Sequence, residues 1–434
     1  MDKMADVLGR AGAWCGQNKY LSAIKNAFQN FMPLTIAGAI GVLWCNVLVN
    51  ESTGLGMFFK PIMALDFLNP AFQAVNFCTI SCITVGITLG IAQEIGIWNM
   101  GAEKAGYIPG LVGLAAWLSV TNTSHMVDGA KEAFTGIAGN ELGATGLFTG
   151  MIIGVLSVEL FCFFEKQDAL KIKMPEQVPP GVARAFEVLV PATITLIITA
   201  CIGSACYNLT GLYLNDVIKN GIQGPLGAVG ATIPGVMIIY LVIMLFWLVG
   251  IHGNNMLSAV KEALFTPLAL ENVEAFNKGE TPKNIINMYA LQMWGEFGGS
   301  GVTIGLVIAI MIFGKREDNK AIATLSLVPG LFNINETVTF GIPMVLNPIL
   351  GIPFVFACLV TIIVGYVLTV IGFCPVACLT VPWTTPPIVF GFLACGANVM
   401  GAVTQAILIV VSTVIYVPFL ISYEKYQNKQ AAEA

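Results

Sequence analysis

The most prominent pattern in the sequence is a series of long apolar runs separated by short polar stretches. A helix needs about 20 mainly apolar residues to cross the hydrocarbon core of a bilayer, and the runs 229–250, 354–373 and 402–421 reach that length. Further spans are predicted at 28–49, 71–93, 107–120, 144–164 and 186–209, the run 229–250 belongs to a span at 228–251, and a glycine-broken apolar segment lies at 285–313. The pattern therefore predicts an all-α polytopic membrane protein with about ten transmembrane helices.

Three apolar segments in the second half of the chain are too short or too interrupted to be ordinary spans: 321–329, 338–350 and 386–395. Irregular backbone at membrane depth is tolerated only where it is buried or lines a cavity. Discontinuous membrane segments also indicate where a transporter binds its solute. We therefore predict two re-entrant hairpins here. The pattern leaves the crossings between His252 and Pro386 open, including the polar stretch 252–284.

The clearest boundary in the chain is a polar segment that carries both lysines and prolines. It holds Lys166, Lys171, Lys173 and Arg184. Cytoplasmic loops of membrane proteins are enriched in Lys and Arg, which places this segment and the basic N-terminal start on the cytoplasmic side, with four spans between them. We predict an N-terminal half (1–164), a linker (165–185) and a C-terminal half (186–434), with both termini in the cytoplasm.

A stripe of small residues lies on the fourth predicted span. Gly146, Gly150 and Gly154 recur every four residues, and Gly86 and Gly90 share that spacing in the second span. Small residues let membrane helices approach closely. The stripe predicts either close helix packing or a dimer contact, and we expect a homodimer interface built mainly from residues before the linker.

Composition excludes a soluble enzyme. Of the 434 residues, 56% are hydrophobic and 10% are charged, whereas a soluble domain has about 25% charged residues. The net charge of −5 comes without a basic patch, so no nucleic acid is expected as a partner. The 11 cysteines lie without metal-ligand spacing, mostly in apolar segments, and we interpret them as buried small residues. No cofactor and no metal are expected.

Two titratable residues are the main candidates for binding chemistry. His252 ends an apolar span within Gly250-Ile251-His252-Gly253, and Asn254 and Asn255 follow it with further hydrogen-bonding groups. Glu336 lies within an apolar segment, where a carboxylate costs about 3 kcal/mol unless it is paired, hydrated or functional. The alternatives are a structural histidine at a helix end and a glutamate that caps a broken helix.

Polar and aromatic groups flank these two residues. Asn333 and Asn335 precede the glutamate, and Glu296 lies in the glycine-rich break 295–301, which is interpreted as a hairpin tip. Trp383 precedes Thr384, Thr385 and Pro386. Aromatic rings beside polar groups suit a sugar, although a tryptophan near a membrane segment is more often an interface anchor.

The combined motifs resemble one family of bacterial proteins. They comprise Gly250-Ile251-His252-Gly253, Pro329–Glu336, Phe340-Gly341-Ile342-Pro343, Asn347-Pro348, the linker Val178–Phe186 with Pro191, and Trp383-Thr384 with Pro386. Together they are similar to the enzyme IIC subunits of the phosphoenolpyruvate-dependent sugar phosphotransferase system, in the lactose/cellobiose/diacetylchitobiose branch. Thr337 is a departure, because relatives commonly have proline after this glutamate.

The resemblance implies a homodimer of ten-span protomers in the bacterial inner membrane. The N-terminal half would form the dimer contact. The C-terminal half would bind a β-linked disaccharide of the cellobiose or diacetylchitobiose type. His252 and Glu336 would approach the sugar's 6-hydroxyl, and a separate cytoplasmic IIB subunit, supplied by IIA, would donate the phosphoryl group; no fused IIB or IIA domain is expected.

Two other functions remain open at this point. In an ion-coupled sugar symporter, Glu336 and His252 would carry protons during each transport cycle. An intramembrane enzyme would need a paired acid and base or a metal constellation, and the sequence shows neither. The two histidines are far apart in the sequence, and no H-E-x-x-H motif is present.

Overall fold

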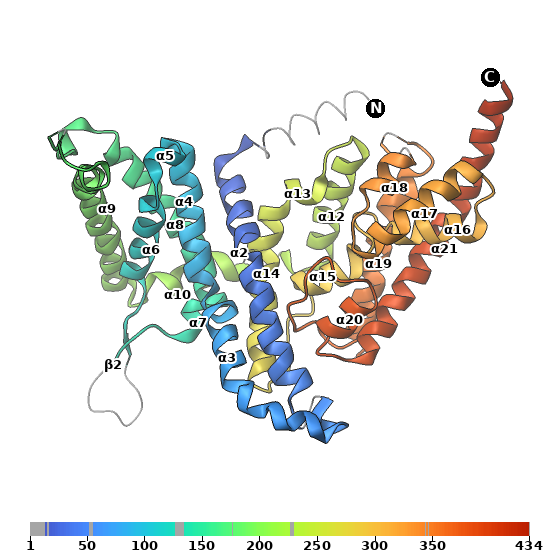
Figure 1. The fold of residues 1–434 in the computed structure, drawn as a ribbon, viewed down its shortest axis with the longest axis horizontal. Helices are drawn as coiled ribbons and strands as arrows, with labels where there is room; N and C mark the ends of the chain where they lie inside the picture. Colours follow the sequence, from blue (N-terminus) through green and yellow to red (C-terminus); the bar gives the residue numbers. More distant parts are fainter. Residues whose placement is uncertain are drawn as a thin grey trace. The chain divides into compact units, whose positions relative to one another are not determined.

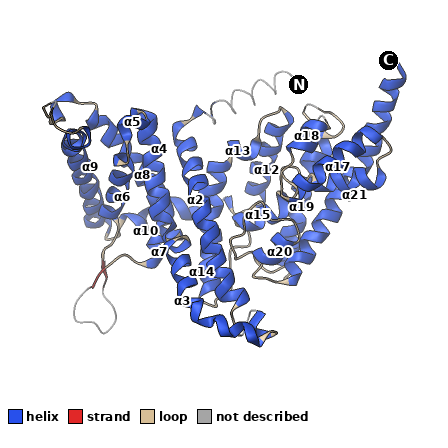
Figure 2. Cartoon of the chain, in the orientation of Figure 1, coloured by secondary structure: helices blue, strands red, loops and turns tan. Residues whose placement is uncertain are grey.

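The fold was determined as a computed structural model that describes residues 14, 17–51, 55–125, 134–175, 177–225, 230–342, 344–345 and 347–433. Most of the predicted polar start, part of the stretch 121–128 and Pro343 of one motif lie outside these ranges. The described chain is almost entirely helical, and its two short strands form one antiparallel pair (Figure 2).

The elements follow one another along the chain with short 3₁₀ and π turns between several of them. The first half contains α2 (Lys19–Leu43), α3 (Asn69–Cys78), α4 (Ile83–Met100), α5 (Ala102–Ala105), α6 (Ile108–Val120), β1 (Ser124–His125), β2 (Phe134–Thr135), α7 (Gly139–Leu142), α8 (Ala144–Glu165), α9 (Pro180–Thr210) and α10 (Leu214–Ile218). The second contains α12 (Ile233–Leu248), α13 (Gly253–Met256), α14 (Ser258–Asn277), α15 (Met288–Gly295), α16 (Ile304–Phe313), α17 (Glu317–Leu331), α18 (Glu336–Gly341), α19 (Gly351–Val370), α20 (Val389–Ala394) and α21 (Val399–Glu433).

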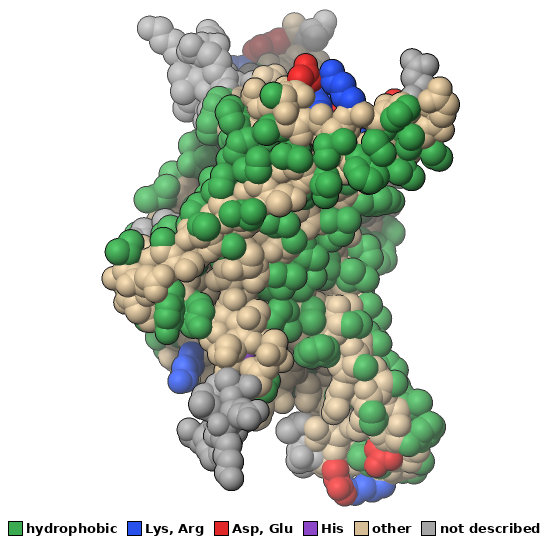
Figure 3. Space-filling model, turned by 90° about the vertical axis from the view of Figure 1, so that its left-hand side faces the viewer, with side chains coloured by type: hydrophobic (Ala, Val, Ile, Leu, Met, Phe, Trp, Pro, Cys, Tyr) green, Lys and Arg blue, Asp and Glu red, His purple; other side chains and the backbone are tan. Residues whose placement is uncertain are grey.

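The helices confirm the predicted class of membrane protein. Within the described residues, six helical segments are long and apolar enough to cross a bilayer, and α6, α12 and α16 are shorter apolar helices. Hydrophobic side chains cover the broad middle of the face drawn in Figure 3, while charged side chains gather toward its two ends. Such an apolar band between polar ends is what a multi-pass membrane protein presents to lipid.

Two elements differ from the sequence prediction. The predicted span 71–93 is interrupted, because α3 ends at Cys78 and α4 begins at Ile83. The polar stretch 252–284 contains α14, a helix of 20 residues with Pro267 inside it. The apolar run length alone did not predict this helix, because it contains charged residues.

By internal contacts the chain forms two compact units. Among the described residues, one comprises those within 17–38 and 74–227, and the other comprises those within 39–73 and 228–434. Helix α9 packs on α6 and α8 (Figure 1), so it belongs to the first unit together with α10. The predicted division into an N-terminal half, a linker and a C-terminal half stays a prediction.

The glycine stripe is used for packing inside the first unit. A Cβ atom on Gly150 would lie 2.2 Å from Oγ1 of Thr88, and one on Gly154 would lie 3.1 Å from the Thr88 carbonyl oxygen. Helices α4 and α8 therefore approach closely at this stripe. Gly86 is similarly close to the ring of Phe31 in α2. Of the two interpretations of the stripe, the structure supports close helix packing.

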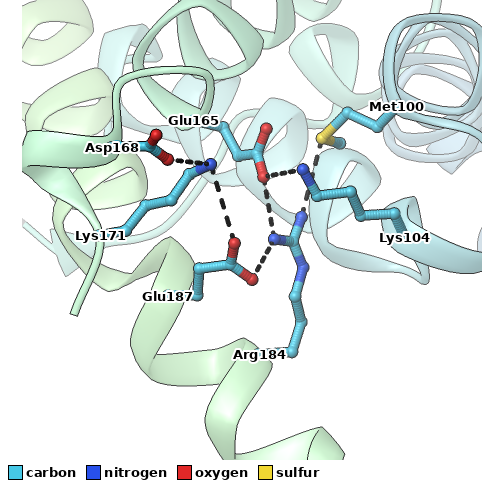
Figure 4. Close-up of polar contacts among 7 residues, drawn as sticks. All are labelled: Met100, Lys104, Glu165, Asp168, Lys171, Arg184 and Glu187. Carbon is cyan, nitrogen blue, oxygen red and sulfur yellow. Dashed lines mark hydrogen bonds and ion pairs between the residues drawn. The ribbon is translucent and has the colours of Figure 1, made fainter. Parts of the chain in front are cut away.

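The linker is fastened to the first unit by a group of ion pairs (Figure 4). Glu165, at the end of α8, is 1% exposed, and its Oε1 lies 2.8 Å from Nζ of Lys104 and 2.9 Å from Nη1 of Arg184. Arg184 also contacts Oε2 of Glu187 at 2.7 Å, and Lys171 lies 3.8 Å from that carboxylate. Arg184 of the linker and Lys104 of α5 thus satisfy a buried carboxylate, and these contacts join the start of α9 to the ends of α5 and α8.

In the second unit, the long helix α21 packs against α16, α19 and α20. Near its end, Glu424 is 5% exposed and accepts hydrogen bonds from the backbone N–H groups of Lys315 (2.9 Å) and Arg316 (3.3 Å). A carboxylate at this place satisfies the free N–H groups that precede α17. Outside the apolar spans, the hydrogen bond from Arg316 lowers the pKa of Asp318. These contacts fix the start of α17, whose other end leads into the segment 332–336.

Candidate functional site

A cavity of about 510 Å³ lies within the second unit. Its volume falls in the range of small-molecule sites, about 300–1,000 Å³. All eight residues that the sequence singled out line it: His252, Asn254, Asn255, Glu296, Asn333, Asn335, Glu336 and Trp383. Seven further residues complete the lining: Gln292, Phe297, Gly299, Ser300, Ile334, Phe390 and Gln405. The structure therefore brings together residues that are spread from 252 to 405 in the sequence.

The imidazole of His252 and the carboxylate of Glu336 face each other across the cavity lining. Nε2 of His252 lies 3.7 Å from Oε1 of Glu336, and the two side chains are 36% and 46% exposed. This distance is too long for a direct hydrogen bond. A hydroxyl group can instead lie beside both atoms, accepting a hydrogen bond from the imidazole and donating one to the carboxylate.

The position of the imidazole is fixed from two sides. His252 is the N-cap residue of α13, and its Nδ1 accepts a hydrogen bond from the backbone N–H of Asn255 at 3.2 Å. The ring also packs against buried Trp247, with 4.5 Å between the centroids. Because Nδ1 accepts, the neutral imidazole carries its proton on Nε2, which faces Glu336.

Asn333 joins two segments of the cavity wall. Its Oδ1 accepts a hydrogen bond from the backbone N–H of Gly298 at 2.6 Å, and its Nδ2 donates to the carbonyl oxygens of Trp383 and Thr385. Its φ is +62°, a left-handed conformation that asparagine tolerates better than most residues. The side chain that was predicted to bind solute thus also holds the glycine-rich break beside the segment that carries Trp383.

The glycine-rich break is shaped by further amides. Nδ2 of Asn335 donates to the carbonyl oxygen of Ser300 at 2.8 Å, and Nδ2 of Asn254 donates to the Ser300 hydroxyl at 3.0 Å. Gly299 has a φ of +84°, and a Cβ there would lie 2.6 Å from Cβ of Asn335. A side chain at this position would therefore force the break away from Asn335.

Gln405 is a site residue that the sequence analysis missed. It is 1% exposed in α21, and its Oε1 accepts hydrogen bonds from the backbone N–H groups of Ile388 (2.7 Å) and Gly391 (2.8 Å). Its Nε2 donates to the carbonyl oxygen of Met293 at 3.3 Å. Ile388 has a φ of +76°, an unfavourable conformation for a β-branched residue. Gln405 therefore holds the start of α20 in place; a lone glutamine in an apolar run was the signal that could have indicated it.

Two buried acceptors on the cavity lining have no partner among the described residues. They are Oδ1 of Asn254 and Oε1 of Gln292. A buried polar group without a partner costs about 1–3 kcal/mol, which a bound polar molecule can recover. Within the described part of the chain, no group of His, Cys, Asp or Glu side chains is arranged to hold a metal ion. The lining therefore combines hydrogen-bond donors, acceptors and aromatic rings, a combination that suits a neutral molecule with many hydroxyl groups.

A helical membrane fold with such a cavity between broken helices defines a transporter of polar solutes. The comparisons give the family. The profile of the family "Phosphotransferase system, EIIC" matches residues 25–358, and the chain belongs to this family. It is therefore a multi-pass membrane permease component of a phosphotransferase system.

Individual relatives are similar over nearly the whole chain. The oligo-beta-mannoside-specific EIIC component of Bacillus subtilis is 32% identical, over 98% of this chain and 94% of the relative. The cellobiose-specific EIIC component of Lactococcus lactis is 29% identical, over 98% of both chains. The crystal structure of the transporter ChbC, the IIC component from the N,N'-diacetylchitobiose-specific system, matches with a TM-score of 0.88 and 30% identity, over 97% of both chains.

Proposed function

We propose that this permease binds a β-linked disaccharide of the cellobiose or diacetylchitobiose type and presents its 6-hydroxyl for phosphorylation. The observation that carries the proposal is the approach of Nε2 of His252 to Oε1 of Glu336 on a cavity of suitable volume. The relatives support the sugar class, because cellobiose, diacetylchitobiose and oligo-beta-mannosides are neutral sugars with β-linkages.

The chemistry at the proposed site follows from the two facing groups. The 6-hydroxyl donates a hydrogen bond to Glu336 and accepts one from Nε2–H of His252, so its oxygen is held in a fixed direction. A phosphocysteine on a cytoplasmic IIB subunit then donates the phosphoryl group: the S–P bond breaks, an O–P bond forms, the hydroxyl proton passes to the Glu336 carboxylate, and the IIB cysteine leaves as a thiolate. The product carries about −1.5 to −2 additional charge near pH 7, which favours its release from a lining that already contains Glu336.

The partners and the membrane topology belong to the same proposal. We expect IIB, supplied by IIA, to dock from the cytoplasm of a bacterial cell, with both chain termini on that side of the inner membrane. We also propose a homodimer joined through the first half of the chain. Large apolar side chains before the linker, such as Leu111, Leu156 and Phe163, are more than half exposed. Cysteine replacements at these positions should crosslink between protomers; crosslinks only at positions after Arg184 would contradict this interface.

A binding panel tests the proposed substrate class. The purified protein should bind cellobiose or diacetylchitobiose in isothermal titration calorimetry. It should bind maltose, whose glucose units are joined by an α-linkage, at least about tenfold more weakly. Equal affinity for α- and β-linked disaccharides, or no affinity for any β-linked member, would contradict the assignment.

A further inference from the structure

Glu296 reaches the cavity from the glycine-rich break, and two buried residues hold one of its oxygens. Oε1 accepts a hydrogen bond from the hydroxyl of Tyr240 at 2.7 Å and forms an ion pair with Nζ of Lys261. Tyr240 is fully buried, and the Lys261 and Glu296 side chains are 7% and 16% exposed. Neither residue that holds Glu296 is on the cavity lining.

These two contacts use the hydrogen-bond acceptor capacity of Oε1 of Glu296 and leave Oε2 available. A carboxylate oxygen has two lone pairs, and the ammonium and phenol groups use both pairs on Oε1. Oε2 has no partner among the described residues, although Glu296 lines the cavity. A carboxylate oxygen can only accept hydrogen bonds, so this end of the cavity requires a donor on the solute.

The pair lies close to the proposed phosphorylation site. His252 and Glu296 line the same cavity, together with Glu336. A solute whose 6-hydroxyl reaches His252 can therefore present another group to Glu296. Burying a charge in a protein interior is expensive unless it is paired, so Lys261 allows an ionised carboxylate to remain at this depth.

We propose that Lys261 and Tyr240 are positioning residues that hold Glu296 with Oε2 directed at a second sugar hydroxyl, and that this contact makes the permease selective for that hydroxyl. The inference rests on the proposed sugar-binding function. Tyr240 fixes the direction of the carboxylate, and Lys261 both fixes its direction and balances its charge. The aromatic ring of Tyr240 also lies 5.6 Å from Nζ of Lys261, which keeps the ammonium group beside Oε1.

The test is equilibrium binding of cellobiose and its monodeoxy analogues to purified variants. A hydrogen bond to a charged group is worth about ten- to a hundredfold in affinity. Glu296→Gln should lower the affinity for cellobiose by about that factor. One monodeoxy analogue, the one that lacks the hydroxyl contacted by Glu296, should bind Glu296→Gln and the wild type equally well. Lys261→Met should give the same pattern. In the double variant the loss should equal that of Glu296→Gln alone, because the two residues act through one contact.

Two further variants complete the design. Tyr240→Phe removes one hydrogen bond without leaving a buried charge, and it should weaken binding about threefold to tenfold at the same hydroxyl. If Lys261→Met does not fold, Tyr240→Phe alone tests whether a neighbouring residue positions Glu296. The matched control is Lys278→Met, because Lys278, the residue directly after α14, forms an exposed ion pair with Glu274 of that helix. The sugar affinity of this variant should equal that of the wild type.

A uniform loss of affinity across all analogues, or additive losses in the double variant, would overturn the positioning role. Unchanged cellobiose binding in Glu296→Gln would overturn the contact itself. These outcomes differ from a failure of the proposed function, in which the wild-type protein would bind none of the β-linked disaccharides.

Discussion

Nε2 of His252 and Oε1 of Glu336 lie 3.7 Å apart, and the imidazole proton faces the carboxylate because Nδ1 is occupied by the backbone of Asn255. The separation leaves both groups exposed to a ligand, which can bridge them with one hydroxyl. In the proposed function, these two groups on separate segments of the chain form one binding point for the sugar.

The first prediction concerns these two residues. Glu336→Gln should weaken disaccharide binding by about ten- to a hundredfold, since a hydrogen bond to a charged group contributes about 1.5–3 kcal/mol. His252→Ala removes a neutral donor and should weaken binding by about threefold to tenfold. Thermal unfolding should change little for Glu336→Gln, whose side chain is partly exposed. His252→Ala also removes the N-cap of α13, so its stability should fall by about 0.5–2 kcal/mol without loss of the fold. Calorimetry on the purified variants measures the effect.

The control for this prediction is Glu94→Gln. Glu94 accepts a hydrogen bond from Nδ2 of Asn26 at 2.9 Å in the first unit, and a glutamine can still accept that bond. Sugar binding should be unaffected. If Glu94→Gln lost binding while Glu336→Gln retained it, the binding site would have to lie elsewhere.

The second prediction concerns the amide of Asn333. Asn333→Gly and Asn333→Ala both remove the hydrogen bonds to Gly298, Trp383 and Thr385, and both should weaken sugar binding by loosening the cavity wall. Alanine should be less stable than glycine by about 1–2 kcal/mol, because it tolerates the left-handed backbone poorly. Thermal melting should rank wild type above Gly and Gly above Ala; equal melting of all three would show that the amide does not hold these segments.

The third prediction tests whether the glycine stripe packs within one chain. Gly150→Leu should destabilise the fold by about 1–3 kcal/mol, because the added side chain would overlap Thr88 and Thr84. Gly181→Leu is the matched control, since a Cβ at Gly181 meets no atom within 4 Å. If Gly150→Leu changed only the oligomeric state and left the melting temperature unchanged, the stripe would be an intermolecular surface.

The fourth prediction concerns the linker. Glu165→Gln removes the buried carboxylate that joins Lys104 and Arg184. The loss should cost about 1–2 kcal/mol, because Lys104 is partly exposed and Arg184 keeps its ion pair with Glu187. The melting temperature should fall while disaccharide affinity stays at the wild-type value. Asp168→Asn, at a side chain that is 81% exposed, should change neither quantity. A loss of sugar affinity in Glu165→Gln would mean that the linker contributes to the site.

Much of the fold could be predicted from the sequence because apolar length directly reflects the thickness of the bilayer. The span predicted at 144–164 is α8, Ala144–Glu165, and the one at 107–120 is α6, Ile108–Val120. The break at Thr79 was not visible, because the residues on both sides remain apolar. Helix α14 was missed because it carries several charged residues. One of them, Lys261, is paired with Glu296, and this pairing is recognised only from the positions of both residues in the structure.

The candidate site could be predicted in part for a similar reason. His252 and Glu336 were recognisable because such groups are costly in an apolar segment. Gln405 and Tyr240 could not be assigned a role, since each acts through a contact with a distant part of the chain. Asn333 was recognised as a cavity residue, but its bonds to two other segments depend on tertiary structure.

The central claim is that phosphoryl transfer, and not an ion gradient, drives uptake. The most direct test is accumulation of labelled disaccharide in vesicles that contain the purified permease, with phosphorylated IIB on the cytoplasmic side and a proton uncoupler present. We predict that sugar 6-phosphate accumulates in spite of the uncoupler and that omission of IIB leaves only slow exchange of unmodified sugar. Uphill accumulation of unmodified sugar without IIB, driven by a pH gradient and abolished by the uncoupler, would contradict the account and identify the protein as a symporter.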